Sequence, residues 1–278
     1  MEQMEQIEQT EERTYVLPAS ILIATVMISA TWFYVEQQKN TKPNESNAPI
    51  AQTVGDMPGE IPNLSPEIIT KLYDLGVIDK TKVQAELSTL NLLWAFGLAN
   101  KNPILEQGPM TGSSEAGLSA EALAKAGGFA STGGWTLSVG DPMSHYSKHA
   151  LVVLTSAQQE LVERVSKNIY RPCCNNSTYF PDCNHGMAML GLLELMASQG
   201  ADELSMYRAA LKANTLWFPN QYATIDRYLV ARGSSLANAN PQEILGRTYS
   251  SGSGFAQIAA AAPAEPASNR PPSGGCSV

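Results

Sequence analysis

One uncharged apolar segment constrains this chain more than any other feature. From Tyr15 to Val35 the sequence reads YVLPASILIATVMISATWFYV and contains no charged side chain. A helix needs about 20 such residues to cross the hydrocarbon core of a bilayer, and aromatic rings such as those of Trp32 and Tyr34 favour the membrane interface. The segment predicts a single transmembrane helix at 15–35, with the lipid bilayer as a partner.

A cleaved signal peptide is the main alternative for this segment. Signal peptides have a basic start, a shorter apolar run and small residues at the cleavage site, whereas residues 1–14 form an acidic tail that begins MEQMEQIEQTEER. Lys39 and Lys42 after the span outnumber Arg13 before it, which favours a cytoplasmic domain only slightly. Because the rest of the chain is poor in Lys and Arg and starts with a polar linker, we expect a single-pass membrane protein with an extracytoplasmic soluble domain.

The chain beyond the span divides by composition into three parts. Residues 36–63 are polar, contain four prolines and have no apolar period, which is typical of an extended, flexible linker. Residues 64–248 carry repeated helical patterns and are numerous enough to enclose a sizeable core. Residues 249–278 are dominated by Ala, Pro, Ser and Gly, and this composition predicts a disordered tail.

The domain at 64–248 is predicted to be mainly α. Ser65 suits the cap of a first helix, Pro66 suits its first position and Gly76 suits its end. A Gly/Ser-rich irregular insertion covers 108–140 and includes one short helix. The other helices are expected at 80–99, at about 118–126, from Asp141, behind a capping box at Ser156–Gln159, at 186–198, 202–217 and 221–232, and from Pro241.

Net charge and missing motifs exclude several functions. The net charge is −8 and the pI is about 5.0, and we find no basic stripe that would bind a phosphate backbone. We therefore predict no nucleic-acid partner. The chain has no P-loop, no dinucleotide-binding glycine pattern after a strand, and no nucleophile elbow. Catalytic residues cannot be assigned, and whether the chain is an enzyme stays open.

Cysteine and histidine are concentrated in one region of the chain. Of its three histidines and four cysteines, all but Cys276 lie within 41 residues. They are His145, His149, Cys173, Cys174, Cys183 and His185.

The spacing of these residues suits metal binding without matching a known motif. His145 and His149 are four residues apart, so on a helix they would lie on one face and share an ion. Cys173, Cys174, Cys183 and His185 form a C-C-x8-C-x-H pattern in the loop before the next helix. This is not the spacing of a zinc finger, a c-type haem or a ferredoxin.

Thiolate and imidazole together favour soft or borderline metal ions. Zinc and copper fit best, and iron or an iron–sulfur cluster is a further option. The leading hypothesis is a membrane-anchored helical protein that binds a metal through the four residues of the C-C-x8-C-x-H pattern. His145 and His149 would complete that site or form a second one. Met187 and Met189 are predicted to belong to the core, and Glu194 to the surface.

A disulfide is the competing interpretation of the cysteines. In an extracytoplasmic domain oxidised cysteines are expected, and a bond from Cys183 to Cys173 or Cys174 would join the two flanking helices. Two alternative functions follow from this. The chain would be a thiol–disulfide redox protein, or a non-catalytic surface or scaffold protein whose disulfide only holds a loop. The sequence indicates neither a substrate nor a protein partner.

Overall fold

The computed structural model describes residues 57–112 and 118–264, all of which fall in one compact unit, residues 49–270. This described part is helical, with eleven α-helices, one 3-10 helix and no strand, which confirms the predicted mainly α domain. None of these helices is long and apolar enough to cross a membrane. The transmembrane helix predicted at 15–35 lies outside the described residues.

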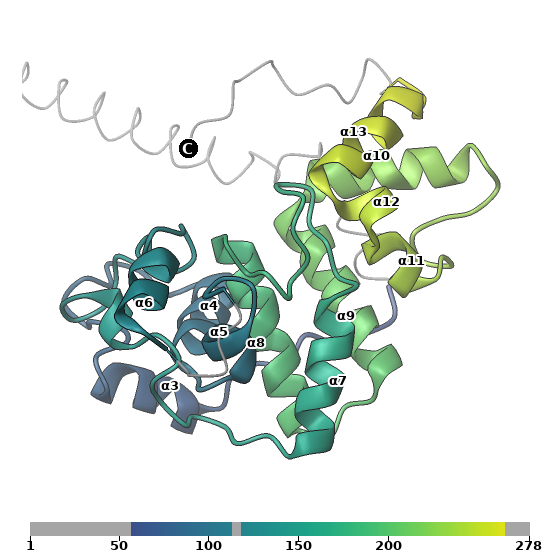
Figure 1. The fold of residues 1–278 in the computed structure, drawn as a ribbon. Helices are drawn as coiled ribbons and strands as arrows, with labels where there is room; N and C mark the ends of the chain where they lie inside the picture. Colours follow the sequence, from purple (N-terminus) through teal and green to yellow (C-terminus); the bar gives the residue numbers. More distant parts are fainter. Residues whose placement is uncertain (1–56, 113–117, 265–278) are drawn as a thin grey trace, which may run out of the picture. The chain divides into compact units, whose positions relative to one another are not determined.

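The helices follow one another along the chain as labelled in Figure 1. They are α3 (Pro66–Asp74), α4 (Thr89–Ala99), α5 (Pro103–Gln107), α6 (Ala120–Gly127), η2 (Pro142–Ser144, the 3-10 helix), α7 (Ser156–Ser166), α8 (Asn184–Ser198), α9 (Glu203–Trp217), α10 (Pro219–Val230), α11 (Pro241–Leu245), α12 (Arg247–Ser250) and α13 (Gly252–Ala261).

Side-chain caps explain where the helices begin. Ser65 accepts the backbone N–H of Ile68 and opens α3, and Gly76 follows its end with a φ of 76°, so both predicted boundaries are confirmed. Ser88 caps α4 in the same way, and the predicted helix at 80–99 is therefore helical only from Thr89. The capping box lies one residue earlier than predicted, with Thr155 as the cap.

Two prolines that follow predicted helices are the first residues of the next helices. Pro103 is the first residue of α5 and Pro219 is the first residue of α10. A proline is tolerated at this position because the N–H that it lacks would have no partner inside the helix. Each proline therefore separates two consecutive helices and leaves both of them intact.

The prediction of a disordered tail at 249–278 is wrong for the first part of this range. Gly252–Ala261 forms α13, whose cap Ser251 accepts the backbone N–H of Gly254. Ile258 of this helix is only 5% exposed, and α13 packs against α10 and α12. A few apolar residues in an Ala/Gly/Ser-rich sequence are enough to dock this helix, and composition alone conceals them.

Helix α8 lies at the centre of the core. Every residue from Gly186 to Ala197 is buried, including Met187 and Met189 as predicted, and the helix packs against α4, α7 and α9. At the crossing with α4, a Cβ placed on Gly191 would lie 2.5 Å from the carbonyl oxygen of Leu93 and 3.0 Å from the backbone nitrogen of Gly97. The two backbones therefore touch, and glycine is required there.

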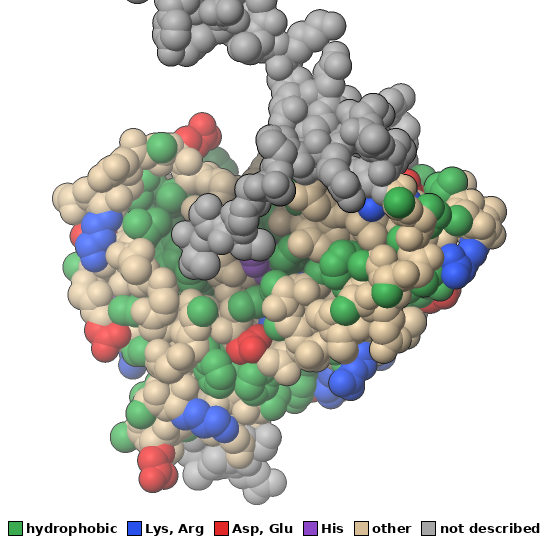
Figure 2. Space-filling view, turned by 90° about the horizontal axis from the view of Figure 1, so that it is seen from above, with side chains coloured by type: hydrophobic (Ala, Val, Ile, Leu, Met, Phe, Trp, Pro, Cys, Tyr) green, Lys and Arg blue, Asp and Glu red, His purple; other side chains and the backbone are tan. Residues whose placement is uncertain are grey.

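Charged side chains do not gather on the face seen in Figure 2. Acidic and basic groups are dispersed there among hydrophobic and uncharged side chains. Among the described residues, the large hydrophobic side chains that are exposed are also few, and Val153 is the most exposed of them at 80%. The cluster of cysteines is thus a more specific feature than the surface charge of this face.

Candidate metal centre

Residues 171–183, here called the cysteine loop, fold around one buried cation. The side chain of Arg171 is only 1% exposed. Its Nη1 donates to the carbonyl oxygen of Asn176 at 3.1 Å, and its Nη2 donates to the carbonyl oxygen of Phe180 at 3.3 Å. Its Nη2 also binds Oδ1 of Asp182 at 2.7 Å. The guanidinium therefore holds the loop from inside through several hydrogen bonds at once, because its planar group carries several N–H donors.

Cys183 joins this loop to α8. It is the cap of the helix, and its sulfur accepts the backbone N–H of Gly186 at 3.4 Å and Nε of Arg171 at 3.0 Å. A Cβ on Gly186 would lie 2.5 Å from Nη2 of Arg171. Only glycine leaves room for the guanidinium at this point, which explains the sequence Cys183-Asn184-His185-Gly186 at the start of α8.

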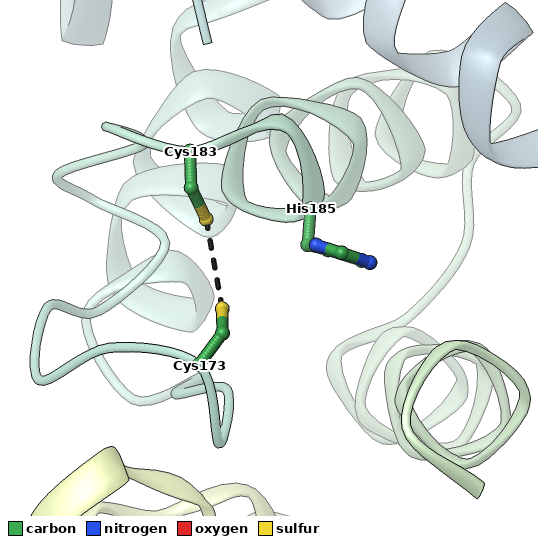
Figure 3. A group of neighbouring side chains, drawn as sticks. All are labelled: Cys173, Cys183 and His185. Carbon is green, nitrogen blue, oxygen red and sulfur yellow. Dashed lines mark hydrogen bonds between the residues drawn. The ribbon is translucent and has the colours of Figure 1, made fainter. Parts of the chain in front are cut away.

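Two sulfurs and one imidazole converge beside the cap. The Sγ atoms of Cys173 and Cys183 are 3.8 Å apart, and one ring nitrogen of His185 completes a group whose ligand atoms all lie within 4.8 Å of one another. Figure 3 shows the two sulfurs pointing toward each other, with the His185 ring extending from the first turn of α8 to one side. The predicted residues Cys173, Cys183 and His185 are thus brought together.

The ring of His185 rests against an aromatic pair. Its centroid is 4.5 Å from that of Phe218 and 5.9 Å from that of Trp217. Both partners lie where α9 ends and α10 begins. The imidazole therefore packs on one side against residues that lie outside the predicted Cys/His pattern.

A second group includes Cys174, Asp182 and Cys183, again within 4.8 Å. The guanidinium of Arg171 already binds two of these three residues, Asp182 at 2.7 Å and Cys183 at 3.0 Å. A metal ion placed here would meet a buried positive charge at close range. The group of Cys173, Cys183 and His185 shares only Cys183 with these arginine contacts, so it is the better cation site.

The protonation states of the thiols are set by their contacts. The pKa of Cys183 lies well below its usual range because the thiols of Cys173 and Cys174 donate hydrogen bonds to it and Arg171 adds positive charge, while burial opposes this. Hydrogen bonding with Cys174 and Cys183 raises the pKa of Cys173. Cys183 is therefore the cysteine of this loop that ionises most readily, and the thiolate is the form that binds metals and attacks disulfides. All three cysteines are free thiols, and no disulfide occurs among the described residues.

His145 and His149 lie side by side, but not on a helix as predicted. His145 follows the 3-10 helix η2, and His149 pairs with Asn100 just after α4. Nδ1 of His145 is 3.1 Å from Nε2 of His149, and burial together with the charges of His145 and Lys148 lowers the pKa of His149. Neither histidine belongs to the groups formed around Cys183.

The prediction that Glu194 is a surface residue is wrong. Its side chain is fully buried and accepts hydrogen bonds from Nδ2 of Asn100 and Nδ2 of Asn102, both at 2.7 Å. Burial raises the pKa of Glu194 to about 8, although the two amide donors oppose the shift. The apolar residues on both sides of it, LGLLELMA, were the sequence signal for this burial.

Comparison with protein-family models, with curated protein sequences and with solved structures gives no match for this chain. Function is therefore inferred from the chemistry of the residues, because fold-level analogy supplies none.

Proposed function

We propose that this domain binds a thiophilic metal ion through Cys173, Cys183 and His185. The observation that carries the proposal is the 3.8 Å separation of the two sulfurs. Two thiolates bound to zinc at about 2.3 Å in a tetrahedral arrangement lie about 3.8 Å apart, so the sulfurs already stand at ligand spacing. A ring nitrogen of His185 within 4.8 Å of both sulfurs supplies the third donor.

Zinc and copper suit this donor set better than iron does. Iron–sulfur clusters are usually held by four cysteine thiolates, whereas the cysteine loop offers three. Zn(II) and Cu(I) both accept mixed thiolate and imidazole ligands. The apolar segment at 15–35, which lies outside the described residues, supports the further proposal that the site is tethered to a membrane. The low Lys and Arg content of the rest of the chain supports a position outside the cytoplasm.

Elemental analysis tests the proposal. The full-length chain is purified in detergent without chelator under reducing conditions, incubated with Zn(II) or Cu(I), desalted and analysed for bound metal. We expect about one ion per chain, as in a mononuclear Cys/His site, and loss of that ion in Cys183→Ser and His185→Ala. His149→Ala, which lies outside the group, is the matched control and keeps the ion. A folded wild-type chain that stays metal-free would refute the proposal.

Thiol–disulfide exchange is a second candidate function, favoured by the lowered pKa of Cys183 beside the exposed Cys173. A disulfide needs a sulfur separation of about 2.05 Å, so the two sulfurs would have to approach by roughly 2 Å. Mass mapping of the chain in glutathione buffers tests this function. A reversible Cys173–Cys183 bond with a potential between about −270 and −120 mV supports redox activity, and no bond in that range rejects it.

A further inference from the structure

The number of ligands in the group limits which ion it suits. Among the described residues, Cys173, Cys183 and His185 form a group of three ligand atoms, and no fourth His, Cys, Asp or Glu joins it. Structural zinc sites almost always have four protein ligands. Cu(I), a soft ion that prefers thiolate, is satisfied by two or three donors. Two sulfurs and one imidazole therefore suit Cu(I) better than a closed zinc site.

The three ligands differ in how strongly their contacts with the rest of the protein restrain them. The sulfur of Cys183 accepts N–H groups from Arg171 and Gly186, and the ring of His185 is packed against Phe218. Cys173 is exposed, and its sulfur contacts other thiols, with no N–H donor from the described residues. An ion bound here would thus keep two anchored ligands and one that solvent and other molecules can reach.

We infer that the site carries Cu(I) as exchangeable cargo, that Cys173 is the ligand exchanged, and that the partner is an acceptor presenting a free thiol. This inference rests on the proposed function, because it specifies the ion and the partner of the same three residues. A structural ion would be enclosed on all sides, whereas here the exposed ligand lies at the loop surface.

The transfer step is a ligand exchange without redox change. The acceptor sulfur bonds to the copper while Cys173 is still bound, because a three-coordinate ion leaves space for a fourth ligand. The bond from copper to the Cys173 sulfur then breaks, and the proton released by the acceptor thiol ends on Cys173. Copper remains Cu(I) throughout, and Cys183 and His185 release it in later exchanges of the same kind.

Metal competition and transfer kinetics test the inference on the full-length chain in detergent, without oxygen. Affinities for Cu(I) and Zn(II) are measured against chromogenic chelators, and X-ray absorption counts the ligands. Transfer is followed at increasing concentrations of reduced glutathione, with a coloured Cu(I) chelator as the final trap. Cys173→Ser is compared with His149→Ala, which removes a possible metal ligand outside the groups formed around Cys183.

We expect Cu(I) to bind at least about 100-fold more tightly than Zn(II), as soft ligands favour, in a shell of two sulfurs and one nitrogen. The transfer rate of the wild-type and His149→Ala chains should rise in proportion to glutathione. Cys173→Ser should bind Cu(I) more weakly and release it at a rate independent of glutathione.

The possible failures are distinguishable. A folded chain that binds neither ion contradicts the proposed function itself. Metal binding with equal affinity for both ions, with a four-ligand shell, or with a wild-type transfer rate independent of glutathione overturns this inference and leaves the proposed function standing. The wild-type measurements decide the matter even where Cys173→Ser does not fold.

Discussion

The Nε atom of Arg171 lies 3.0 Å from the sulfur of Cys183, and this contact connects the buried centre of the cysteine loop to the first turn of α8. The same guanidinium binds the carboxylate of Asp182. One buried cation therefore sets both the path of the loop and the position of the thiolate that caps the helix. The candidate site depends on this arrangement as much as on its three ligands.

Replacing Arg171 should damage the fold far more than replacing an exposed arginine. Arg171→Met removes the guanidinium that donates to Asp182 and to two loop carbonyls, and breaking an ion pair with a buried member in this way costs about 3 kcal/mol. Arg164→Met is the matched control, because the Arg164–Glu203 pair is 55% and 39% exposed and should contribute less than about 1 kcal/mol. Urea unfolding measures both, and similar losses for the two variants would show that the Arg171 contacts are unimportant.

The crossing of α4 and α8 should not tolerate a methyl group. In Gly191→Ala the new Cβ would stand 2.5 Å from the carbonyl oxygen of Leu93, and because backbone cannot move aside cheaply we expect a loss of about 1–3 kcal/mol in unfolding free energy. Gly128→Ala is the control, since its Cβ would meet only an ordinary contact at 3.4 Å. That variant should stay within about 0.5 kcal/mol of wild type. Equal stability of the two variants would mean that the helices can separate without cost.

Local signals in the sequence predicted the helices whose ends carry recognisable caps. The Ser65 cap and the glycine at position 76 defined α3 correctly. The predicted helix ends at 99 and 217 are confirmed, but the helix starts at the two prolines that follow were not predicted, because proline has two positional meanings. Pro103 and Pro219 can end one helix or begin another, and only the path of the chain in space decides between them.

The sequence indicated the ligands of the candidate site but not the residues that hold these ligands in place. Clustering in sequence pointed to six residues, and it did not separate Cys173, Cys183 and His185 from the other three, because nearness along the chain does not by itself bring side chains together. The role of Arg171 depends on the loop closing around it, and the support of His185 by Phe218 comes from helices more than 30 residues later in the chain. Such long-range contacts produce no local pattern in the sequence from which they could be predicted.

Glu194 should make the domain less stable as the pH rises. Burial lifts its pKa from the ordinary value of 4.5 to about 8, so between these values the folded chain binds more protons than the unfolded chain. The contribution of Glu194 to stability is therefore full below about pH 4.5, falls as the pH rises, and levels off above about pH 8. Urea unfolding at pH 5, 6, 7 and 8 measures the trend.

Glu194→Gln removes the titrating carboxyl, so its stability should not decline between pH 5 and pH 8 as that of the wild type does. Its NH2 group would face an amide donor, because both carboxylate oxygens accept from amide nitrogens, so the variant should be less stable than wild type near pH 5. Asn100 and Asn102 keep their amide orientations, because Val152 and Ile104 donate to their oxygens. The control Glu160→Gln, at an exposed carboxylate, should retain the wild-type slope. A Glu194→Gln chain that keeps the wild-type slope would show that another group is responsible.

Helix α13 should be needed for the cysteine loop to keep its shape. The backbone N–H of Gly252 donates to the carbonyl oxygen of Cys174 at 2.7 Å, and that of Ser253 donates to the Asn175 side chain at 2.8 Å. A chain ending at residue 250 keeps α12, loses both contacts and loses the burial of Ile258, which alone is worth about 1.5–3 kcal/mol. We expect lower stability by at least that amount and faster alkylation of Cys174.

A chain ending at residue 264 is the matched control, because it retains α13 and lacks the same final residues, including Cys276. It should unfold and react as the full-length chain does. If residues 249–278 were merely a disordered tail, both truncations would behave alike, because no contact to the loop would be lost. A difference between the two truncations in urea unfolding and in the rate of thiol alkylation would therefore show that α13 stabilises the cysteine loop. This is the loop in which the sulfurs of Cys173 and Cys183 lie at ligand spacing.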